Sequence, residues 1–507
     1  MEEASSAYHD NSVNIQRTPE HGQRKTVDGG ILLVIEAKGN VTWEILLVCY
    51  LPIGVCIHQM AAFAPSYVLV FALSCPLRYI LTRSWLHAGY HLTGATAGPA
   101  LLSLPYAFAL VGWVPGVLAL LLGAGISFYS YYILITIVEH FESQGKRFVC
   151  FRSLADHIMG KRWSLFFIAP LQFVICYVTV IAAVLVGGVC MKEIYMLYNP
   201  DGPLKLYQFI SLFGVMTAVL AQTPSFHSLR HVNFLSILLC LGYSLCATCG
   251  SIIGGLSADA SAKVYTVKGD LIHKTFGVFG SLAIIATSFG NPIIVEIQGT
   301  VSRPARRKMI KGLLLCYSVV VLTFLSVSVS GYWAFGNAAQ SNIFDNMASK
   351  NGTLVVPRRL LVMAYAFVFL QLIAVSVVYL QPAFDVLETH VADVNKGRYS
   401  IRNLAPRVVG RTFFVGSASF FAAMLPFFGD INALMGALGY TPLVFVFPII
   451  FSIIVYRPSK MGFTYWFHVL LIVCFSILTV LGSLAAVGQL SLDAHKYRLF
   501  ADNIMSM

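Results

Sequence analysis

Charged residues are scarce in this sequence. Only 11% of its 507 residues are Asp, Glu, Lys or Arg, whereas 57% are hydrophobic; a soluble protein carries about 25% charged residues. The net charge of +12 suggests a nucleic-acid partner at first, but the basic residues lie at the ends of apolar runs, where they orient membrane segments. The composition therefore predicts an all-α, polytopic membrane protein with one large membrane domain and no nucleic-acid partner.

Motifs for catalysis and for metals are lacking as well. The apolar runs contain no His-Glu-x-x-His pattern and no paired aspartates, which argues against a membrane-embedded enzyme, a metal site or a resident cofactor. Cys246 and Cys249 have redox spacing, but they lie mid-span without a second pair, so packing explains them better. The first thirty residues show no signal-peptide pattern.

Long apolar runs, by contrast, are plentiful. A helix needs about 20 apolar residues to cross a bilayer. Beyond residue 83, the charge-free runs predict eleven transmembrane helices: 84–112, 115–140, 163–191, 206–223, 231–255, 275–301, 310–335, 359–384, 408–426, 430–456 and 463–489. The membrane domain is thus predicted over 84–489.

The basic residues predict the orientation of these helices. If the first helix leaves the cytoplasm, the cytoplasmic connections hold 18 Lys and Arg and the outer connections and C-terminus hold 10. Residues 1–30 are then a disordered cytoplasmic tail, 31–40 a cytoplasmic lead-in and 490–507 a short extracellular tail. Asn351-Gly352-Thr353 is a glycosylation sequon on a loop that this topology places outside.

Two predicted spans are interrupted in the same way. Thr287 to Pro292 lies inside the sixth span, and Pro292 cannot continue a helix. We expect that helix to stop at about Ala286 and to restart at Pro292, with Asn291 as N-cap. Thr96 to Ala100 repeats the pattern in the first span. Ordinary proline kinks are the alternative, but paired breaks in corresponding positions are typical of a transporter binding site.

Eleven helices with breaks in the first and sixth divide as five plus five plus one. This arrangement predicts two inverted five-helix repeats and one extra helix, with the site at mid-membrane.

Seven segments carry a resemblance to a known family over about Ser84 to Asp502. They are Trp85–His91, Pro99–Phe108, Pro224–Arg230, Gly290–Gln298, Gly331–Gly336, Tyr379–Pro382 and Met424–Asp430. The chain resembles the amino acid/auxin permease family of the amino acid–polyamine–organocation superfamily, and within it the plant GABA transporter branch. The resemblance implies proton-coupled symport of amino acids, GABA among them, into the cell at the plasma membrane. One departure is Val295, where the family pattern has proline.

The substrate chemistry follows from the breaks. An amino acid brings a carboxylate, which suits the N–H groups of the restarted helix, and an ammonium, which suits carbonyls at the preceding helix end. Tyr177 lies mid-span and could donate to the carboxylate or pack as a bonded aromatic. The predicted substrate-binding residues are Thr96, Ala97, Gly98, Pro99, Ala100, Leu101, Tyr177, Thr287, Ser288, Phe289, Gly290 and Asn291.

Glu296 is the only acidic residue in the sequence between Lys274 and Arg303, and it lies one turn past the second break. An ionisable group at membrane depth indicates a functional role, so Glu296 is the predicted proton-coupling residue. A structural carboxyl bonded to a neighbouring helix is the alternative.

Other functions on the same fold stay open. A solute-sensing receptor and a sodium-coupled amino acid symporter both fit the pattern, whereas a channel does not need two broken helices. A monomer in the lipid bilayer is the expected functional unit.

Residues 41–83 form an atypical hydrophobic insert ahead of the first predicted span. Ile45 to Leu77 contains no charged residue, yet Pro52, Pro65 and Pro76 interrupt it. We expect either a pair of short membrane segments or, in preference, a translated intron or gene-model error outside the working protein.

Overall fold

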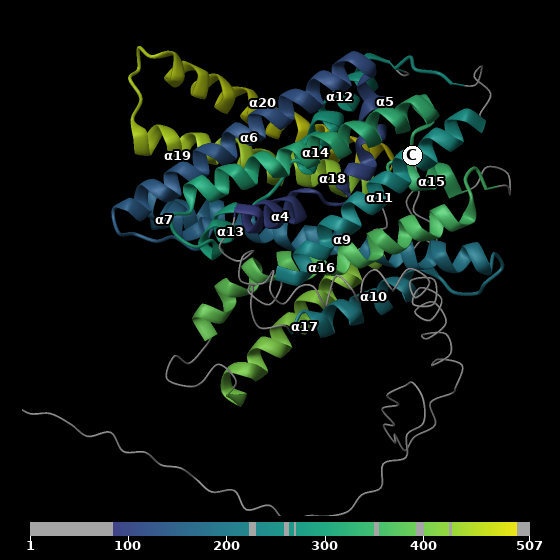
Figure 1. Ribbon diagram of the computed structural model, residues 1–507, viewed down its shortest axis with the longest axis horizontal. Helices are drawn as coiled ribbons and strands as arrows, with labels where there is room; N and C mark the ends of the chain where they lie inside the picture. Colours follow the sequence, from purple (N-terminus) through teal and green to yellow (C-terminus); the bar gives the residue numbers. More distant parts are fainter. Residues whose placement is uncertain are drawn as a thin grey trace, which may run out of the picture. The chain divides into compact units, whose positions relative to one another are not determined.

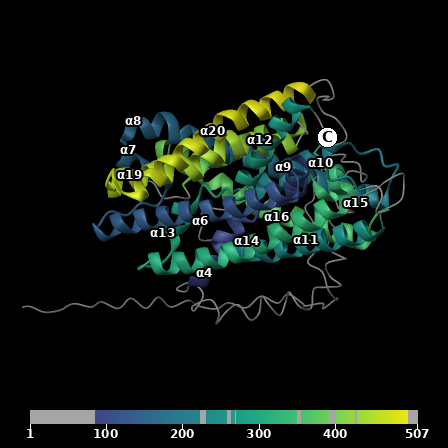
Figure 2. The ribbon, with the colours of Figure 1, turned by 90° about the horizontal axis from the view of Figure 1, so that it is seen from above.

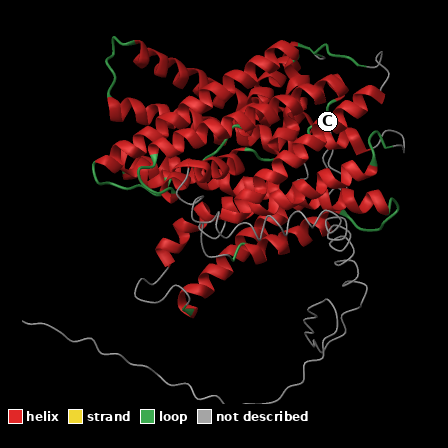
Figure 3. Cartoon of the chain, viewed as in Figure 1, coloured by secondary structure: helices red, strands yellow, loops and turns green. Residues whose placement is uncertain are grey.

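The computed structural model describes residues 85–222, 230–257, 263–267, 270–348, 354–391, 400–424 and 428–493 (Figures 1 and 3). The chain divides into two compact units, 1–51 and 52–507, and every described residue belongs to the second. The predictions for 1–30, 31–40, 41–83 and Asn351, and all but the first residues of the predicted tail 490–507, lie outside the described residues.

The first half of the described chain is a succession of helices. In order, they are α4 (Trp85–Thr96), the 3-10 turn η1 (Pro99–Ser103), α5 (Leu104–Val111), α6 (Trp113–Ser143), α7 (Phe151–Met159), α8 (Lys161–Trp163), the π-helical η2 (Ser164–Ile168), α9 (Ala169–Tyr198), α10 (Leu206–Leu220) and α11 (Arg230–Ser257).

The second half continues in the same way. It contains α12 (Leu271–Ser288), α13 (Ile294–Thr300), α14 (Arg306–Phe335), the 3-10 turn η5 (Gly336–Ala338), α15 (Ile343–Ala348), α16 (Arg358–Val391), α17 (Ile401–Met424), α18 (Phe428–Leu434), the π-helical η6 (Met435–Val446), α19 (Phe447–Tyr456) and α20 (Phe463–Asp493). Because no strand occurs among the described residues, the all-helical prediction is confirmed for this part of the chain.

The predicted spans and the observed helices agree in position but not all in length. Each of the eleven predicted ranges overlaps a helix. Of the described helices, seven are long and apolar enough to cross a membrane, and eight if the bent pair 85–111 is one span. α10, at Leu206–Leu220, is shorter. The chain is a multi-pass membrane protein, while the count of eleven crossings and the inverted repeats stay predictions.

Small residues allow the helices to pack closely, as they do in membrane interiors. α4 lies beside α14 in both Figures 1 and 2. A Cβ added to Gly312 of α14 would lie 2.7 Å from the backbone nitrogen of Gly89 on α4. The same holds for α9 and α10, where a Cβ on Gly188 would lie 2.8 Å from the Ile210 backbone nitrogen.

The first break is confirmed. α4 ends at Thr96 and the chain bends by 46° into the following helix. Gly98 is the N-cap of η1 in an extended conformation, and Pro99 occupies the first helical turn. Proline is tolerated there because its missing N–H would have no helical partner.

The second break is confirmed in kind but displaced by two residues. α12 continues to Ser288 rather than Ala286, and α13 begins at Ile294 rather than Pro292. The predicted N-cap was wrong, because Ile293 caps α13. Asn291 instead uses its side-chain oxygen to accept from the Ile293 N–H at 3.2 Å, inside the break. This local bond holds Pro292 outside the restarted helix.

A third irregularity faces the breaks. η6 is π-helical over Met435–Val446 and contains Pro442, which lacks an N–H. Thr441 Oγ1 donates to the Gly436 carbonyl at 2.6 Å and so satisfies backbone that the irregular helix leaves open. π-helical segments frequently occur at functional sites.

Candidate functional site

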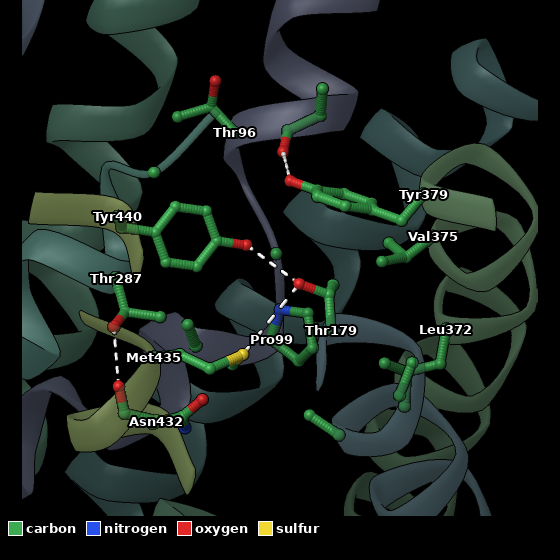
Figure 4. A pocket seen from close by; sticks show the side chains of 16 residues that line it. Thr96, Pro99, Thr179, Thr287, Leu372, Val375, Tyr379, Asn432, Met435 and Tyr440 are labelled. Carbon is green, nitrogen blue, oxygen red and sulfur yellow. Dashed lines mark hydrogen bonds between the residues drawn. The ribbon is translucent and has the colours of Figure 1, made fainter. Parts of the chain in front are cut away.

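A small cavity of about 60 Å³ lies between the two breaks (Figure 4). Such a space holds a few water molecules. Five parts of the chain surround it: the two broken helices, α9, α16 and the α18–η6 segment. Its lining consists of Ala95, Thr96, Gly98, Pro99, Ala100, Thr179, Ala182, Ala183, Thr287, Gly290, Leu372, Val375, Tyr379, Asn432, Met435 and Tyr440.

Hydrogen bonds join the two breaks directly. The side-chain amide of Asn291 donates to Thr96 Oγ1 at 3.1 Å. The hydroxyl of Tyr131, on α6, donates to the Phe289 carbonyl at 2.7 Å and accepts from the Asn291 N–H at 2.6 Å. All four residues are buried. Broken backbone at membrane depth needs such partners because no water is available to it.

The backbone of the first break is largely occupied. Gln371 Nε2 donates to the Ala97 carbonyl at 2.7 Å, and Tyr379 OH donates to the Ala95 carbonyl at 3.2 Å. The Gly98 N–H donates to the Thr96 carbonyl at 2.9 Å, and the Leu101 N–H donates to the Gly98 carbonyl at 3.3 Å. Of the N–H groups expected to bind a carboxylate, those at both ends of the stretch are therefore already bonded.

Ala100 carries the remaining donor of that stretch. Pro99, which precedes it, has no N–H, and both residues line the cavity. The Ala100 N–H belongs to the first turn of η1, where donors have no partner within the helix. A carboxylate in the cavity would find its helix-end donor here.

The opposite wall supplies side-chain polar groups. Thr179 Oγ1 and Tyr440 OH lie 3.0 Å apart (Figure 4). The Thr179 hydroxyl donates to the Ile175 carbonyl at 2.7 Å. Thr287 Oγ1 donates to the Asn432 carbonyl at 2.7 Å. These groups give the cavity hydroxyls and carbonyl oxygens on the side facing η1.

Apolar side chains make up the rest of the lining. They come from α9, α16 and η6, and are Ala182, Ala183, Leu372, Val375 and Met435. A cavity with polar groups and an apolar wall suits a small molecule that has charged ends and a short hydrocarbon stem.

Two glycines in the lining have opposite surroundings. A Cβ added to Gly98 would meet no atom within 4 Å, so its backbone borders open space. A Cβ added to Gly290 would lie 2.2 Å from the ring of Tyr440. Gly290 is therefore needed for Tyr440 to reach the cavity, whereas Gly98 leaves room for a ligand.

The structure brings half of the predicted substrate-binding residues to this cavity. Thr96, Gly98, Pro99, Ala100, Thr287 and Gly290 line it. Ala97, Leu101, Ser288, Phe289 and Asn291 lie in or next to the breaks but are not among the lining residues, and all five are buried. Tyr177 is not in the lining either: its hydroxyl donates to Ser417 Oγ on α17 at 3.0 Å, and its ring packs on Phe414.

Sequence reasoning missed the residues from α9, α16, α18 and η6. Tyr379 stands in one of the segments that carry the family resemblance, and Tyr440 precedes Thr441-Pro442 inside an apolar span. An in-span proline next to polar residues was the available signal for Tyr440. Thr179 and Asn432 give no such signal, because single polar residues are common in these helices.

Glu296 lies on α13, buried and outside the cavity lining. Its Oε1 accepts from the Phe151 N–H at 3.0 Å and from Gln172 Nε2 at 3.1 Å. The carboxyl thus contacts α7 and α9, and the structure supports a buried, hydrogen-bonded ionisable group at the position predicted from the sequence.

Asp345 is a second unusual carboxyl, outside the membrane-spanning segments. It lies on α15, and its Oδ1 accepts from Asn342 Nδ2 at 3.1 Å. Burial raises the pKa of Asp345 to about 8, and the negative charge of Glu193 contributes to that rise. Asp345 is therefore protonated over part of the physiological pH range. It lies outside both breaks and is not in the cavity lining.

Comparison with known proteins places this geometry in context. Residues 82–491 match a family described as transmembrane amino acid transporter protein. The chain is 47% identical over 420 residues to GABA transporter 1 of Arabidopsis thaliana, covering 83% of this chain and 93% of that protein. It is 27% identical over 433 residues to lysine histidine transporter-like 1 of the same plant, covering 84% and 92%. A Na⁺-coupled sialic acid symporter, solved substrate-bound and outward-open, has a TM-score of 0.47 at 12% identity, covering 83% and 91%.

Proposed function

The chain belongs to the transmembrane amino acid transporter family, and on this premise we propose that it imports small amino acids, GABA among them, by symport with protons. The family and the similar proteins are transporters rather than enzymes, which confirms that the chain is not an enzyme.

The cavity between the two broken helices is the observation that carries the proposal. Its lining combines the Ala100 N–H, the hydroxyls of Thr179 and Tyr440, and the Asn432 side chain with an apolar wall. GABA has a carboxylate, an ammonium and three methylenes between them. The helix-end N–H and the hydroxyls suit its carboxylate, the carbonyl oxygens suit its ammonium, and the apolar wall suits its stem.

The size of the cavity also bears on the proposal. About 60 Å³ is room for a few water molecules rather than for a whole amino acid. The site must therefore widen when substrate enters, as alternating access requires. The broken helices supply the movable parts, because each ends and restarts at the cavity.

Glu296 is the proposed proton-coupling residue. It is buried in the first turn of α13, the helix that restarts after the second break, so its charge state can bias that helix. We further propose eleven crossings arranged as inverted repeats, a cytoplasmic N-terminus, a plasma-membrane location and a monomeric working unit.

Radiolabelled uptake in transport-deficient yeast tests the proposal. Cells expressing the chain should accumulate GABA faster as external pH falls, and a protonophore should abolish accumulation. Cells with an empty vector supply the baseline, and parallel assays with and without sodium separate the coupling ions. Uptake that needs sodium and ignores the protonophore would contradict proton coupling, and surface-expressed protein without any uptake would favour a solute sensor.

A further inference from the structure

α7 is a short amphipathic helix that begins without a cap of its own. The residue before the first turn, Cys150, accepts no hydrogen bond from a backbone N–H of the helix with its side chain, and its thiol instead donates to Ser153 Oγ at 3.2 Å. The first N–H groups of a helix need an outside acceptor, and they favour negative charge. Here the Phe151 N–H donates to Glu296 Oε1, from a residue 145 positions away on α13. The carboxyl of the restarted helix thus holds the start of α7.

α7 rests on the bundle by one apolar face. Phe151, Leu154 and Ala155 are buried, and the Phe151 ring packs 5.6 Å from Phe451 of α19. The same carboxylate oxygen of Glu296, Oε1, also accepts from Gln172 Nε2 of α9. One buried carboxylate therefore joins three elements: α13, α7 and α9.

α9 leads from this junction to the cavity. Gln172, Cys176, Thr179 and Ala183 follow one another at helical spacing and share one face. Gln172 bonds Glu296, while Thr179 and Ala183 line the cavity. The rise from Gln172 to Thr179 is about 10 Å at 1.5 Å per residue.

Cys176 lies between Gln172 and Thr179 on α9. It lies about one helical turn from Gln172 and about one turn from Thr179 on this face of α9. Cys176 is fully buried. The Glu296 junction and the cavity therefore lie along the same face of α9, about two helical turns apart.

Two other hydrogen bonds near this junction involve more exposed side chains. Arg147 Nη2, in the loop before α7, donates to the Gly299 carbonyl of α13 at 2.6 Å. Arg303 Nε, just after α13, lies 3.2 Å from Glu142 Oε1 of α6. The two arginine side chains are 47% and 56% exposed, and exposed pairs contribute little. The bond from the Phe151 N–H to Glu296 is buried, so its loss should weaken the contact between α7 and α13 more than loss of either exposed bond.

Building on the function proposed above, we propose that Glu296 is the latch of a cytoplasmic gate formed by α7. The ionised carboxylate accepts from Phe151 and Gln172 and keeps α7 seated. Protonation replaces these charge-assisted bonds by weaker neutral ones, so that α7 separates from α13 and the cavity opens along Gln172, Cys176 and Thr179. Release of substrate into the cytoplasm is thereby tied to arrival of the proton.

Other titratable groups on the neighbouring elements bear on this pH dependence. The helices packed on α13, together with α9, carry these His, Cys, acidic and basic side chains: His87 and His91 on α4, Glu139, His140 and Glu142 on α6, Arg152, Asp156 and His157 on α7, and Cys176, Cys190, Lys192 and Glu193 on α9. Of these, Glu142 pairs with Arg303, and His157 lies 3.3 Å from Lys146. A variant that changes Glu296 alone at constant pH separates its role from theirs.

Labelling of the native Cys176 thiol tests the latch. Inside-out vesicles expose the cytoplasmic face to a membrane-impermeant maleimide at pH 7.5, and peptide mass spectrometry quantifies each cysteine. Glu296→Gln, which imitates the protonated carboxyl, should raise Cys176 labelling about fivefold, the effect of about 1 kcal/mol on the opening equilibrium. Gln172→Leu, which removes one of the two donors, should raise it by a smaller factor.

Controls make the outcome decisive. Glu139→Gln removes a negative charge from α6 without touching the latch, and it should leave Cys176 labelling at the wild-type level. Cys240 on α11 and Cys316 on α14, both buried, should stay unlabelled in every variant. Equal Cys176 labelling in the wild type, Glu296→Gln and Gln172→Leu would overturn the proposal. The assay needs no substrate, so the latch can fail while proton-driven uptake persists, and the reverse.

Discussion

The substitution Gly98→Ala tests whether the cavity binds the transported substrate, because it should change the cavity without changing the folding of the protein. Gly98 has φ −97° and ψ 175°, an extended conformation that alanine adopts freely. An added Cβ meets nothing within 4 Å, so the protein should fold and reach the membrane as before. The free energy of unfolding should change by less than about 0.5 kcal/mol.

The methyl group nevertheless takes space that the ligand needs. The cavity has a volume of about 60 Å³, and a methyl is about the size of a water molecule, whose share of liquid volume is about 30 Å³. Forcing one extra carbon into a packed site costs about 1–3 kcal/mol. KM for GABA uptake should therefore rise about tenfold or more, since about 1.4 kcal/mol corresponds to a factor of ten.

Two further glycines serve as controls in the same uptake assay. Gly125→Ala, on the exposed face of α6, also adds a Cβ to open space and should leave KM unchanged. Gly290→Ala would place a Cβ 2.2 Å from the Tyr440 ring and should reduce the amount of folded protein at the surface. Wild-type KM in Gly98→Ala at normal surface expression would refute the assignment of this cavity to the substrate.

Three other predictions concern single side chains, and a fourth concerns the insert. Asn291→Ala removes the bond to Thr96 and should lower the maximal uptake rate more than surface abundance, as measured by biotinylation; parallel losses of both would indicate a folding role alone. Tyr440→Phe removes the hydroxyl 3.0 Å from Thr179 and should raise KM several-fold, the effect of about 1 kcal/mol; an unchanged KM would remove Tyr440 from the site. Asp345 has a folded-state pKa raised to about 8, so its burial opposes folding increasingly as pH rises from about 4 to 8. Asp345→Asn should accordingly raise the melting temperature at pH 8.5 by about 2–4 °C and have little effect near pH 4, whereas a pH-independent shift would contradict this reasoning. Deletion of 41–83 should leave uptake intact, and loss of uptake in a deletion variant that reaches the surface would show that the insert belongs to the working protein.

The positions of the helices could be predicted from the sequence because the signal is strong. A bilayer requires long apolar runs with internally bonded backbone, so charge-free runs and helices coincide. The break at Thr96 to Pro99 was equally predictable, since proline cannot continue the preceding helix. These features depend on local chemistry that a single sequence contains.

The exact ends of the second break could not be predicted in the same way. Capping rules placed Asn291 at the start of the helix, but its side chain is held by Thr96 and its backbone by Tyr131. Those partners lie 195 and 160 residues away in sequence. Tertiary bonds therefore decided where α12 stops and where α13 begins.

Only the part of the candidate site that belongs to the two helix breaks could be predicted from the sequence. Glycine and proline indicate the helix breaks in the sequence, and six of the residues predicted there line the cavity. The opposite wall comes from α9, α16 and η6, whose lining residues reach the cavity only through helix packing. Glu296 was recognised because charge is rare at membrane depth, but its contact with Phe151 of α7 depends on the folded arrangement.

Proteoliposomes containing the purified protein give the most direct test of proton-driven substrate uptake through the cavity. A gradient with the outside acidic, imposed without sodium, should drive GABA accumulation above equilibrium in vesicles with the wild-type chain, and much less in vesicles with Gly98→Ala. Collapse of the gradient should return GABA to equilibrium. Accumulation that requires a sodium gradient and is indifferent to pH, or wild-type accumulation by Gly98→Ala, would contradict the account.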